Sequence, residues 1–299
     1  MNNWFFLALL SPAIFTVNIF IDKYVLESKV KDYRGVVVYS AITGLTAGTL
    51  FWIMFKMPIL PLFDAFIILT TGILTIWGYY FYFKALSSSQ TSYIIGLLQM
   101  IPVVTLIFSF VFLKETISSL QLLGFFLVLF SATALSYKKQ KKKFKLDPSF
   151  YYILLADVFF AAGNVLIKFA TNTNSFTQII TYESWGIAIG GIILFLAVQP
   201  VRSAFLQTTK TAGKKVLGIM FLNETILIVA KAVTFLAISL GSVSLVTVLG
   251  GTQVFYGIIL GIFLTIIAPH IFKENIKKKE LTKKIIFMGI LFVGIWLIH

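Results

Sequence analysis

Two charged residues within one long apolar run are the side chains of this sequence best placed to carry chemistry. Glu224 and Lys231 stand seven residues apart in the run 216–238. Seven residues are nearly two helical turns, so both side chains lie on one face, about 10 Å apart along the helix axis. They cannot pair directly at that rise, but they can line one cavity. We interpret them as part of a substrate or proton pathway; the alternative is that each charge satisfies a polar partner on a neighbouring helix.

Further polar side chains lie deep in other apolar runs. Asp157 and Asn164, also seven residues apart, share a helical face, and the Asp157 carboxyl is predicted either to bind or exchange a proton or to be a hydrogen-bonded structural group. The amides of Gln99 and Gln253 either bond a neighbouring helix or contact substrate. The full set of candidate residues for a substrate or proton pathway is Glu224, Lys231, Asp157, Asn164, Asn18, Tyr79, Trp77, Gln99, Asn223 and Gln253.

The aromatic residues of the run 65–83 allow two interpretations. Trp77 and Tyr79 belong either to an aromatic belt at the membrane interface or to a cavity wall that offers ring faces and a hydroxyl to an organic solute. Glu183, near the start of another run, is expected at the interface. Asp22 and Lys168 are expected at helix ends, where their side chains reach water.

Several kinds of chemistry lack the residues they need. The chain has no cysteine, and its two histidines, His270 and His299, are too far apart for a local metal motif. We find no nucleotide-binding motif, no paired carboxylates at catalytic spacing and no nucleophile motif. The sequence therefore predicts a protein that is not an enzyme and uses no cofactor or metal.

The composition shows what must position these residues. Of 299 residues, 59% are hydrophobic and 12% are charged, against roughly 25% charged in an ordinary soluble domain. A bilayer core needs about 20 apolar residues per helix. We predict an all-α integral membrane protein with ten transmembrane helices, at 4–22, 36–55, 65–83, 93–112, 120–137, 150–169, 179–198, 216–238, 243–266 and 284–298.

Glycines within these runs favour close helix packing. The pairs Gly44 and Gly48, Gly186 and Gly190, and Gly257 and Gly261 each have the small-xxx-small spacing of helix contacts, with dimerisation as a lesser possibility. The segment Gly250-Gly251-Thr252 is expected to loosen the ninth helix near its centre.

The charges predict an orientation. Lys and Arg number 25 and Asp and Glu number 11, giving a formal net charge of +14. Nearly all basic residues fall in alternate connections, and the opposite side holds only Lys56, Lys114 and Lys168. The positive-inside rule therefore places the lysine-rich connections in the cytoplasm and both termini outside. We interpret the lysine runs as orientation signals and predict no nucleic-acid partner.

The two halves of the sequence repeat each other. Phe83 and Phe235, like Ala85 and Ala237, match at a constant offset, and so do Ser87 with Ser239 and Ser92 with Ser244. This divides the chain into a first five-helix repeat (1–137), a lysine-rich linker (138–147) and a second repeat (148–299). An odd number of crossings per repeat inverts the second copy, and inverted repeats are the usual basis of alternating access.

The motifs resemble a known family. Phe83-Lys84-Ala85-Leu86-Ser87-Ser88, Leu98-Gln99-Met100-Ile101-Pro102-Val103-Val104 and Leu113-Lys114-Glu115 make the sequence similar to EamA-type ten-helix members of the drug/metabolite transporter superfamily. The resemblance implies a carrier of small organic solutes, often an exporter. Such members commonly have cytoplasmic termini, whereas the charge bias here predicts the reverse.

Together these features predict a secondary active transporter that exports a small organic metabolite or drug-like solute by alternating access. Proton coupling through Glu224 or Asp157 is a hypothesis based on their depth in the apolar runs. The alternatives are a flippase for a lipid or lipid-linked substrate and a membrane-embedded enzyme. We expect a multi-pass protein of the cell membrane, a monomer or homodimer, whose partners are a small-molecule solute and the lipid bilayer.

Overall fold

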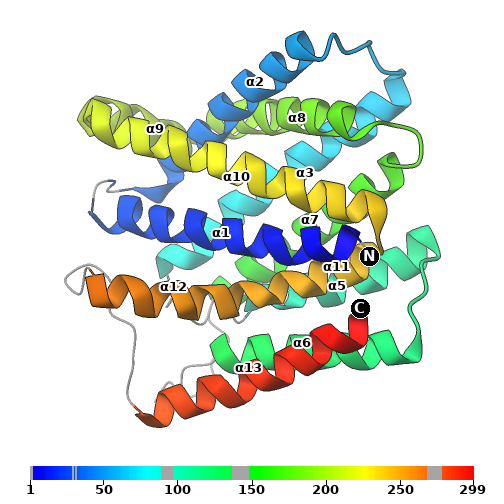
Figure 1. The fold of residues 1–299 in the computed structure, drawn as a ribbon. Coiled ribbons are helices and arrows are strands. Elements are labelled where there is room, and N and C mark those ends of the chain that lie inside the picture. The colour runs from blue at the N-terminus through cyan, green and yellow to red at the C-terminus, as the bar shows by residue number, and fades with distance from the viewer. Residues whose placement is uncertain (1–2, 29, 31, 89–96, 137–147, 268–277) are drawn as a thin grey trace.

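The computed structural model describes residues 3–28, 30, 32–88, 97–136, 148–267 and 278–299, and every regular element within these ranges is helical (Figure 1). The lysine-rich linker predicted at 138–147 lies outside the described residues. The elements of the first half are α1 (Asn3–Ser28), η1 (Tyr33–Gly35), α2 (Val36–Met54), α3 (Leu62–Ser88), α5 (Met100–Phe108), η2 (Ser109–Leu113) and α6 (Ser119–Ser136).

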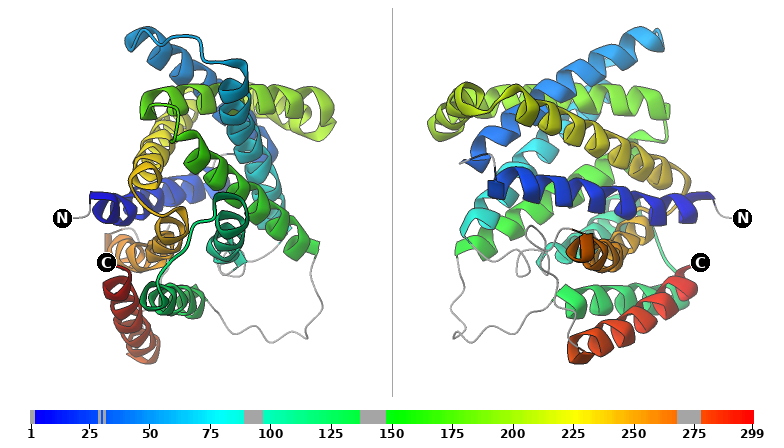
Figure 2. Two further views of the ribbon diagram at one scale, coloured as in Figure 1. Left: turned by 90° about the vertical axis from the view of Figure 1, so that its right-hand side faces the viewer. Right: turned by 60° about the vertical axis from the view of Figure 1, so that its left-hand side comes forward.

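The second half is likewise helical. Its elements are α7 (Pro148–Ala170), α8 (Phe176–Ala197), α9 (Gln199–Thr211), α10 (Lys214–Leu240), α11 (Val243–Leu249), η3 (Gly250–Thr252), α12 (Gln253–Ile267) and α13 (Lys278–Ile298). The two chain ends lie close together at one end of the bundle (Figures 1 and 2).

Seven helical segments among the described residues are long and apolar enough to cross a membrane. Three shorter apolar helices, Met100–Leu113, Ser119–Ala134 and Lys284–Ile298, coincide with the remaining predicted runs. The first part of the run 93–112 falls outside the described residues. Seven spans therefore meet the length criterion, and ten crossings stay a prediction.

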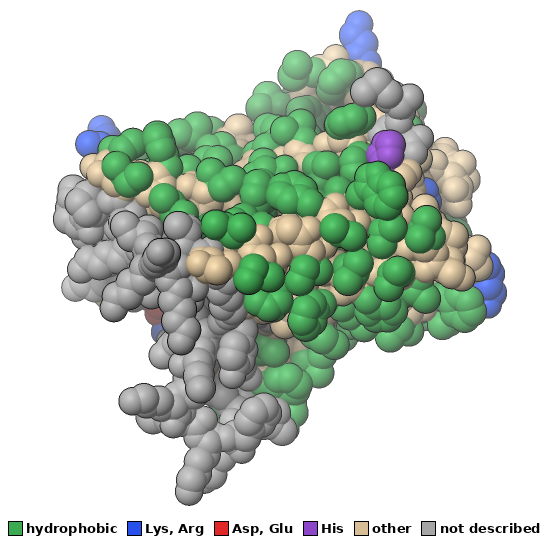
Figure 3. All heavy atoms as spheres, turned by 60° about the horizontal axis from the view of Figure 1, so that its bottom comes forward, with side chains coloured by type: hydrophobic (Ala, Val, Ile, Leu, Met, Phe, Trp, Pro, Cys, Tyr) green, Lys and Arg blue, Asp and Glu red, His purple; other side chains and the backbone are tan. Residues whose placement is uncertain are grey.

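The outer surface of the bundle is apolar. Large hydrophobic side chains such as Leu62, Phe66 and Trp296 are exposed, and Figure 3 shows hydrophobic side chains covering much of one face while basic groups lie toward its edges. In water such a surface would drive aggregation, whereas hydrocarbon solvates it. The exposed apolar surface is what a multi-pass membrane protein presents to lipid.

Each half packs mainly against the other. Helix α3 packs against α7, and α10 packs against α1. Helix α2 crosses α8, and α6 packs along α13, where a Cβ added to Gly124 would lie 2.7 Å from the carbonyl oxygen of Gly294. The core is therefore built from contacts between the two halves, whose helices lie among one another in Figure 2.

Two of the three glycine pairs mark close helix contacts, as predicted. A Cβ on Gly44 would lie 2.8 Å from the Ser184 carbonyl oxygen, and one on Gly186 would lie 2.1 Å from that of Leu69. In the third pair, a Cβ added to Gly257 meets no described atom within 4 Å, so close packing of that pair stays a prediction.

Two local features modify the predicted helices. The ninth run is interrupted by the η3 turn, Gly250–Thr252, between α11 and α12, which confirms the expected loosening. Helix α9 was not predicted, because its sequence is too polar for a span. It buries Val201, Ala204 and Thr208 on one side, against η1 of the other half, and leaves Arg202 and Lys210 exposed.

Candidate functional site

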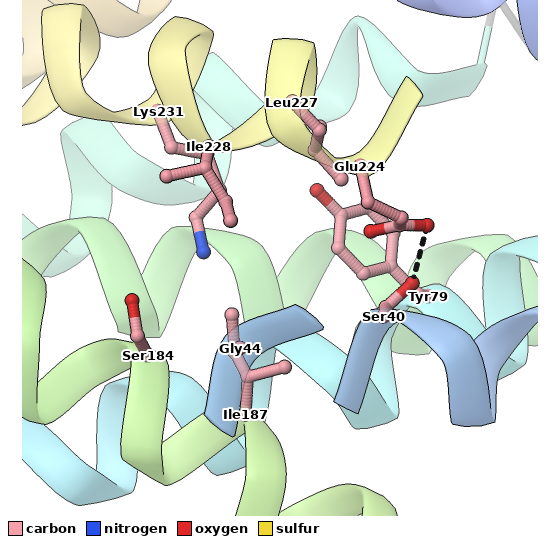
Figure 4. Close-up of a pocket in the computed structure, with 9 residues that line it drawn as sticks. All are labelled: Ser40, Gly44, Tyr79, Ser184, Ile187, Glu224, Leu227, Ile228 and Lys231. Atoms are coloured by element: carbon pink, nitrogen blue, oxygen red, sulfur yellow. Dashed lines mark hydrogen bonds between the residues drawn. The ribbon is translucent and has the colours of Figure 1, made fainter. Parts of the chain in front are cut away.

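A small internal cavity lies between α2, α3, α8 and α10, so both halves contribute to it (Figure 4). Its lining residues are Ser40, Gly44, Tyr79, Ser184, Ile187, Glu224, Leu227, Ile228 and Lys231. The cavity has a volume of ≈ 10 Å³, which is about the space of one water molecule. The structure thus shows a polar site that is nearly closed. We call it the central pocket.

Glu224 is the acidic group of the central pocket. It is buried in α10, and its Oε1 accepts a 2.7 Å hydrogen bond from the Ser40 hydroxyl of α2 (Figure 4). The bond joins the second half of the chain to the first. As the i,i+7 spacing predicts, Glu224 and Lys231 line the same cavity.

Lys231 has a partner that the sequence analysis did not assign. Its ammonium forms an ion pair with Glu183 of α8, and both side chains are almost completely buried. The prediction that Glu183 is interfacial is therefore wrong. A capping box at Ser175 starts α8 early, and this places Glu183 two turns inside the helix, where an unpaired charge would be costly. Lys231 also lies 5.6 Å from the centroid of the Phe235 ring.

Tyr79 forms an aromatic wall of the central pocket, and Trp77 does not. The Tyr79 ring packs at 5.4 Å from that of Phe160 in α7 and at 6.4 Å from that of Phe83. Trp77 packs instead on Phe81, at a ring distance of 6.4 Å. Two rings on α3 thus have different surroundings, although they are two residues apart in sequence.

Asn18 and Asn223 form a polar network beside the pocket. The Asn18 amide donates to the main-chain oxygen of Asn223 at 3.0 Å, and the Asn223 amide donates to Asp22 at 2.7 Å. These bonds tie α1 to α10 one residue before Glu224.

Asp157 and Asn164 do not line the central pocket. Asp157 is fully buried in α7, and neither of its carboxylate oxygens has a hydrogen-bond partner in the part of the chain that the structure describes. Asn164, seven residues further along α7, is half-buried. Asp157 is thus a second candidate site, apart from the pocket.

Gln99 and Gln253 lie at interruptions of their helices. Gln99 precedes α5, and Gln253 is the first residue of α12, directly after the η3 turn. A Cβ on Gly251 would lie 3.2 Å from the Gln99 side-chain oxygen, and the Gln253 main-chain oxygen accepts a 3.4 Å bond from Thr16. Neither glutamine lines the central pocket.

The sequence analysis missed three polar contributors to this region: Ser40, Ser184 and Glu183. Serine is common in membrane helices as a packing residue, so its type carries little signal. Glu183 carried a stronger signal, namely a carboxylate within a long apolar run, but its depth was misjudged. Among the described residues, no group of three or more acidic or histidine side chains could hold a metal ion.

Comparison with known proteins gives the family. Residues 2–137 match the EamA-like transporter family. This match covers the first predicted repeat, which is less than half of the chain. The match confirms the resemblance to the drug/metabolite transporter superfamily in residues 2–137, and the apolar helices fit a multi-pass membrane protein. No curated protein gives a significant match.

Solved structures share the fold over nearly the whole chain. Twenty-eight chains of solved structures match this chain. One of them, a crystal structure described only as that of a protein, has a TM-score of 0.59 at 15% sequence identity. The similarity covers 99% of this chain and 95% of the other. At this identity the likeness concerns the fold alone.

Proposed function

We propose that the protein is a secondary active transporter that exports a small organic solute across the cell membrane by alternating access. The observation that carries this proposal is the central pocket, in which Ser40 and Tyr79 of the first half face Glu224 and Lys231 of the second. Charged side chains turned inward between two helical repeats are typical of substrate or ion pathways.

The packing supports the inverted repeat on which alternating access depends. If α1, α2, α3 and α6 correspond to α7, α8, α10 and α13, then the contact of α3 with α7 has its counterpart in that of α10 with α1. On the same scheme, α2 packs on its own counterpart α8, and α6 on α13. These pairings are the ones expected around a two-fold axis in the membrane plane.

One pair of helix contacts departs from this scheme. Helices α3 and α8 pack closely where Gly72 meets Gly186, whereas their counterparts α10 and α2 touch sparsely and are joined by the bond between Ser40 and Glu224. Because the nearly closed pocket cannot admit an organic solute, transport requires it to widen. We propose that α2 and α10 separate to open it, and that α3 and α8 separate in the opposite state.

Glu224 and Asp157 are the proposed sites of proton coupling. Each is a carboxyl within a membrane-spanning helix, so its charged form has little solvent to stabilise it. A proton taken up by one of these carboxyls on one side of the membrane and released on the other would couple the proton gradient to the movement of the solute. By the positive-inside rule we propose that the lysine-rich connections face the cytoplasm.

The test is reconstitution of the purified protein into sealed vesicles with a panel of labelled metabolites, measured with and without an imposed pH gradient. We expect uphill movement of at least one compound when the gradient is present. Glu224→Gln should abolish uphill movement and spare exchange down a gradient, whereas Asp64→Asn at the start of α3 removes a carboxylate outside the pocket and should change neither.

The outcomes separate the proposed function from its alternatives. Uphill, pH-driven transport that is normal in both Glu224→Gln and Asp157→Asn would remove these residues as coupling sites. Transbilayer movement of a labelled lipid without movement of any soluble solute would identify a flippase, and chemical conversion of a compound would identify an enzyme. Either result overturns the proposal.

A further inference from the structure

The charges around the central pocket do not balance. The one buried ammonium, Lys231, is paired with Glu183, and both ion pairs found among the described residues leave Glu224 without a basic partner. The Ser40 hydroxyl supplies Glu224 with one neutral hydrogen bond. A carboxylate buried with so little compensation favours an incoming positive charge.

A further carboxylate adds to this imbalance. Asp22 lies next to the pocket through its bond to Asn223, and it too is acidic. This region of the described chain therefore holds three carboxyl groups (Asp22, Glu183 and Glu224) and a single ammonium group. When these carboxyl groups are ionised, the field in the pocket is negative, and a low-dielectric setting strengthens it.

The remaining walls fit an apolar molecule. Ile187, Leu227 and Ile228 supply aliphatic surface, and the Tyr79 ring lies beside Glu224 in Figure 4. An aromatic face within about 6 Å of a cation attracts it through the ring quadrupole. An anion would meet the repulsion of Glu224 and gain nothing from Lys231, because that ammonium already has its counter-ion.

Building on the proposed function, we infer that the central pocket binds a monovalent organic cation, an ammonium group attached to an apolar body, with Glu224 as its counter-ion. The ammonium replaces the Ser40 hydroxyl as the main partner of Glu224. This replacement would also break the contact that joins α2 to α10, so binding and opening would occur together. Lys231 and Glu183 act as a neutral pair that shapes the wall.

The test uses three probes of almost equal size that differ in charge: phenethylammonium, phenethyl alcohol and phenylacetate. Their binding to the purified protein in detergent is measured by titration calorimetry at neutral pH. We expect phenethylammonium to bind at least about tenfold more tightly than the other two, which is one decade in Kd. Glu224→Gln should remove this preference, and Asp64→Asn should keep it.

A second variant separates the pocket charge from the structural pair. The double variant Glu183→Gln with Lys231→Met removes one charge of each sign, so it should keep the cation preference. Loss of the preference in this double variant, tighter binding of phenylacetate to the wild type, equal binding of all three probes, or binding of none at about 10 mM would overturn the inference.

This result and the vesicle experiment can fail independently. Glu224-dependent, pH-driven transport of an anionic metabolite would overturn the cation inference and leave the transporter proposal standing. Selective binding of phenethylammonium in a protein that moves no solute across vesicles would sustain the binding site and overturn the proposed transport.

Discussion

Lys231 of α10 and Glu183 of α8 form an ion pair in the interior of the helix bundle. Both residues belong to the second half of the chain, whereas the bond between Ser40 and Glu224 joins the two halves. The pair therefore fixes α8 and α10 to each other beside the pocket. The hydrogen bond between Ser40 and Glu224 is the contact that would break if α2 and α10 separate.

The ion pair predicts a characteristic pattern of stability. Lys231→Met and Glu183→Gln each leave one buried charge without a partner and should each destabilise the protein by about 3–5 kcal/mol. The double variant removes both charges and should be more stable than either single variant. Thermal unfolding in detergent for the four proteins measures this coupling; strictly additive effects would show that the two groups do not interact.

Because α3 and α8 pack closely, we predict that Gly186 cannot be replaced by a residue with a side chain without loss of stability. A Cβ there would lie 2.1 Å from the Leu69 carbonyl oxygen, and backbone atoms cannot move aside as a flexible side chain can. Gly186→Ala should lower the stability by about 1–3 kcal/mol, the usual cost of overpacking. Gly257→Ala is the matched control, since its added methyl meets open space. A similar unfolding temperature for both variants would contradict the packing argument.

The helices were the most predictable part of the fold, for a physical reason. Backbone groups in lipid have no partner but one another, so a long apolar run such as 179–198 must be helical. Even there the structure extends the element to Phe176–Ala197, because Ser175 caps it. Helix α9 was missed because it is short and half polar.

The candidate site was predictable only within a single helix. The i,i+7 spacing of Glu224 and Lys231 follows from helix geometry, and the structure places both at one pocket. The partner of Lys231 depends on which helices become neighbours, and Glu183 is 48 residues away in the sequence. No local pattern encodes that distance. The same holds for Ser40, on a helix of the other half.

The pair of Asp32 and Arg34, in the connection between α1 and α2, predicts that stability depends on pH. Asp32 accepts hydrogen bonds from Arg34, and these hold the pKa of its carboxyl below the ordinary value of 3.8. A lowered pKa in the folded state means that the stabilising contribution is present above pH 3.8 and is lost as the pH falls through the folded-state pKa. Asp32→Asn should therefore narrow the difference in unfolding temperature between pH 6 and pH 3 by a small amount, because the pair is partly exposed. An unchanged difference in the variant would show that the pair makes no contribution.

Asp157 predicts a gain of stability with a loss of function. Its carboxylate is fully buried, and neither oxygen has a hydrogen-bond partner in the described part of the chain. Burying a polar group without a partner costs about 1–3 kcal/mol by mutational measurements, so Asp157→Leu, which is apolar and branched at the same carbon, should raise the unfolding temperature. If the residue is retained for proton coupling, the same variant should lose pH-driven transport in vesicles. A variant less stable than the wild type would instead indicate a structural partner for Asp157. Normal transport by a stabilised variant would show that the buried carboxyl has no part in coupling.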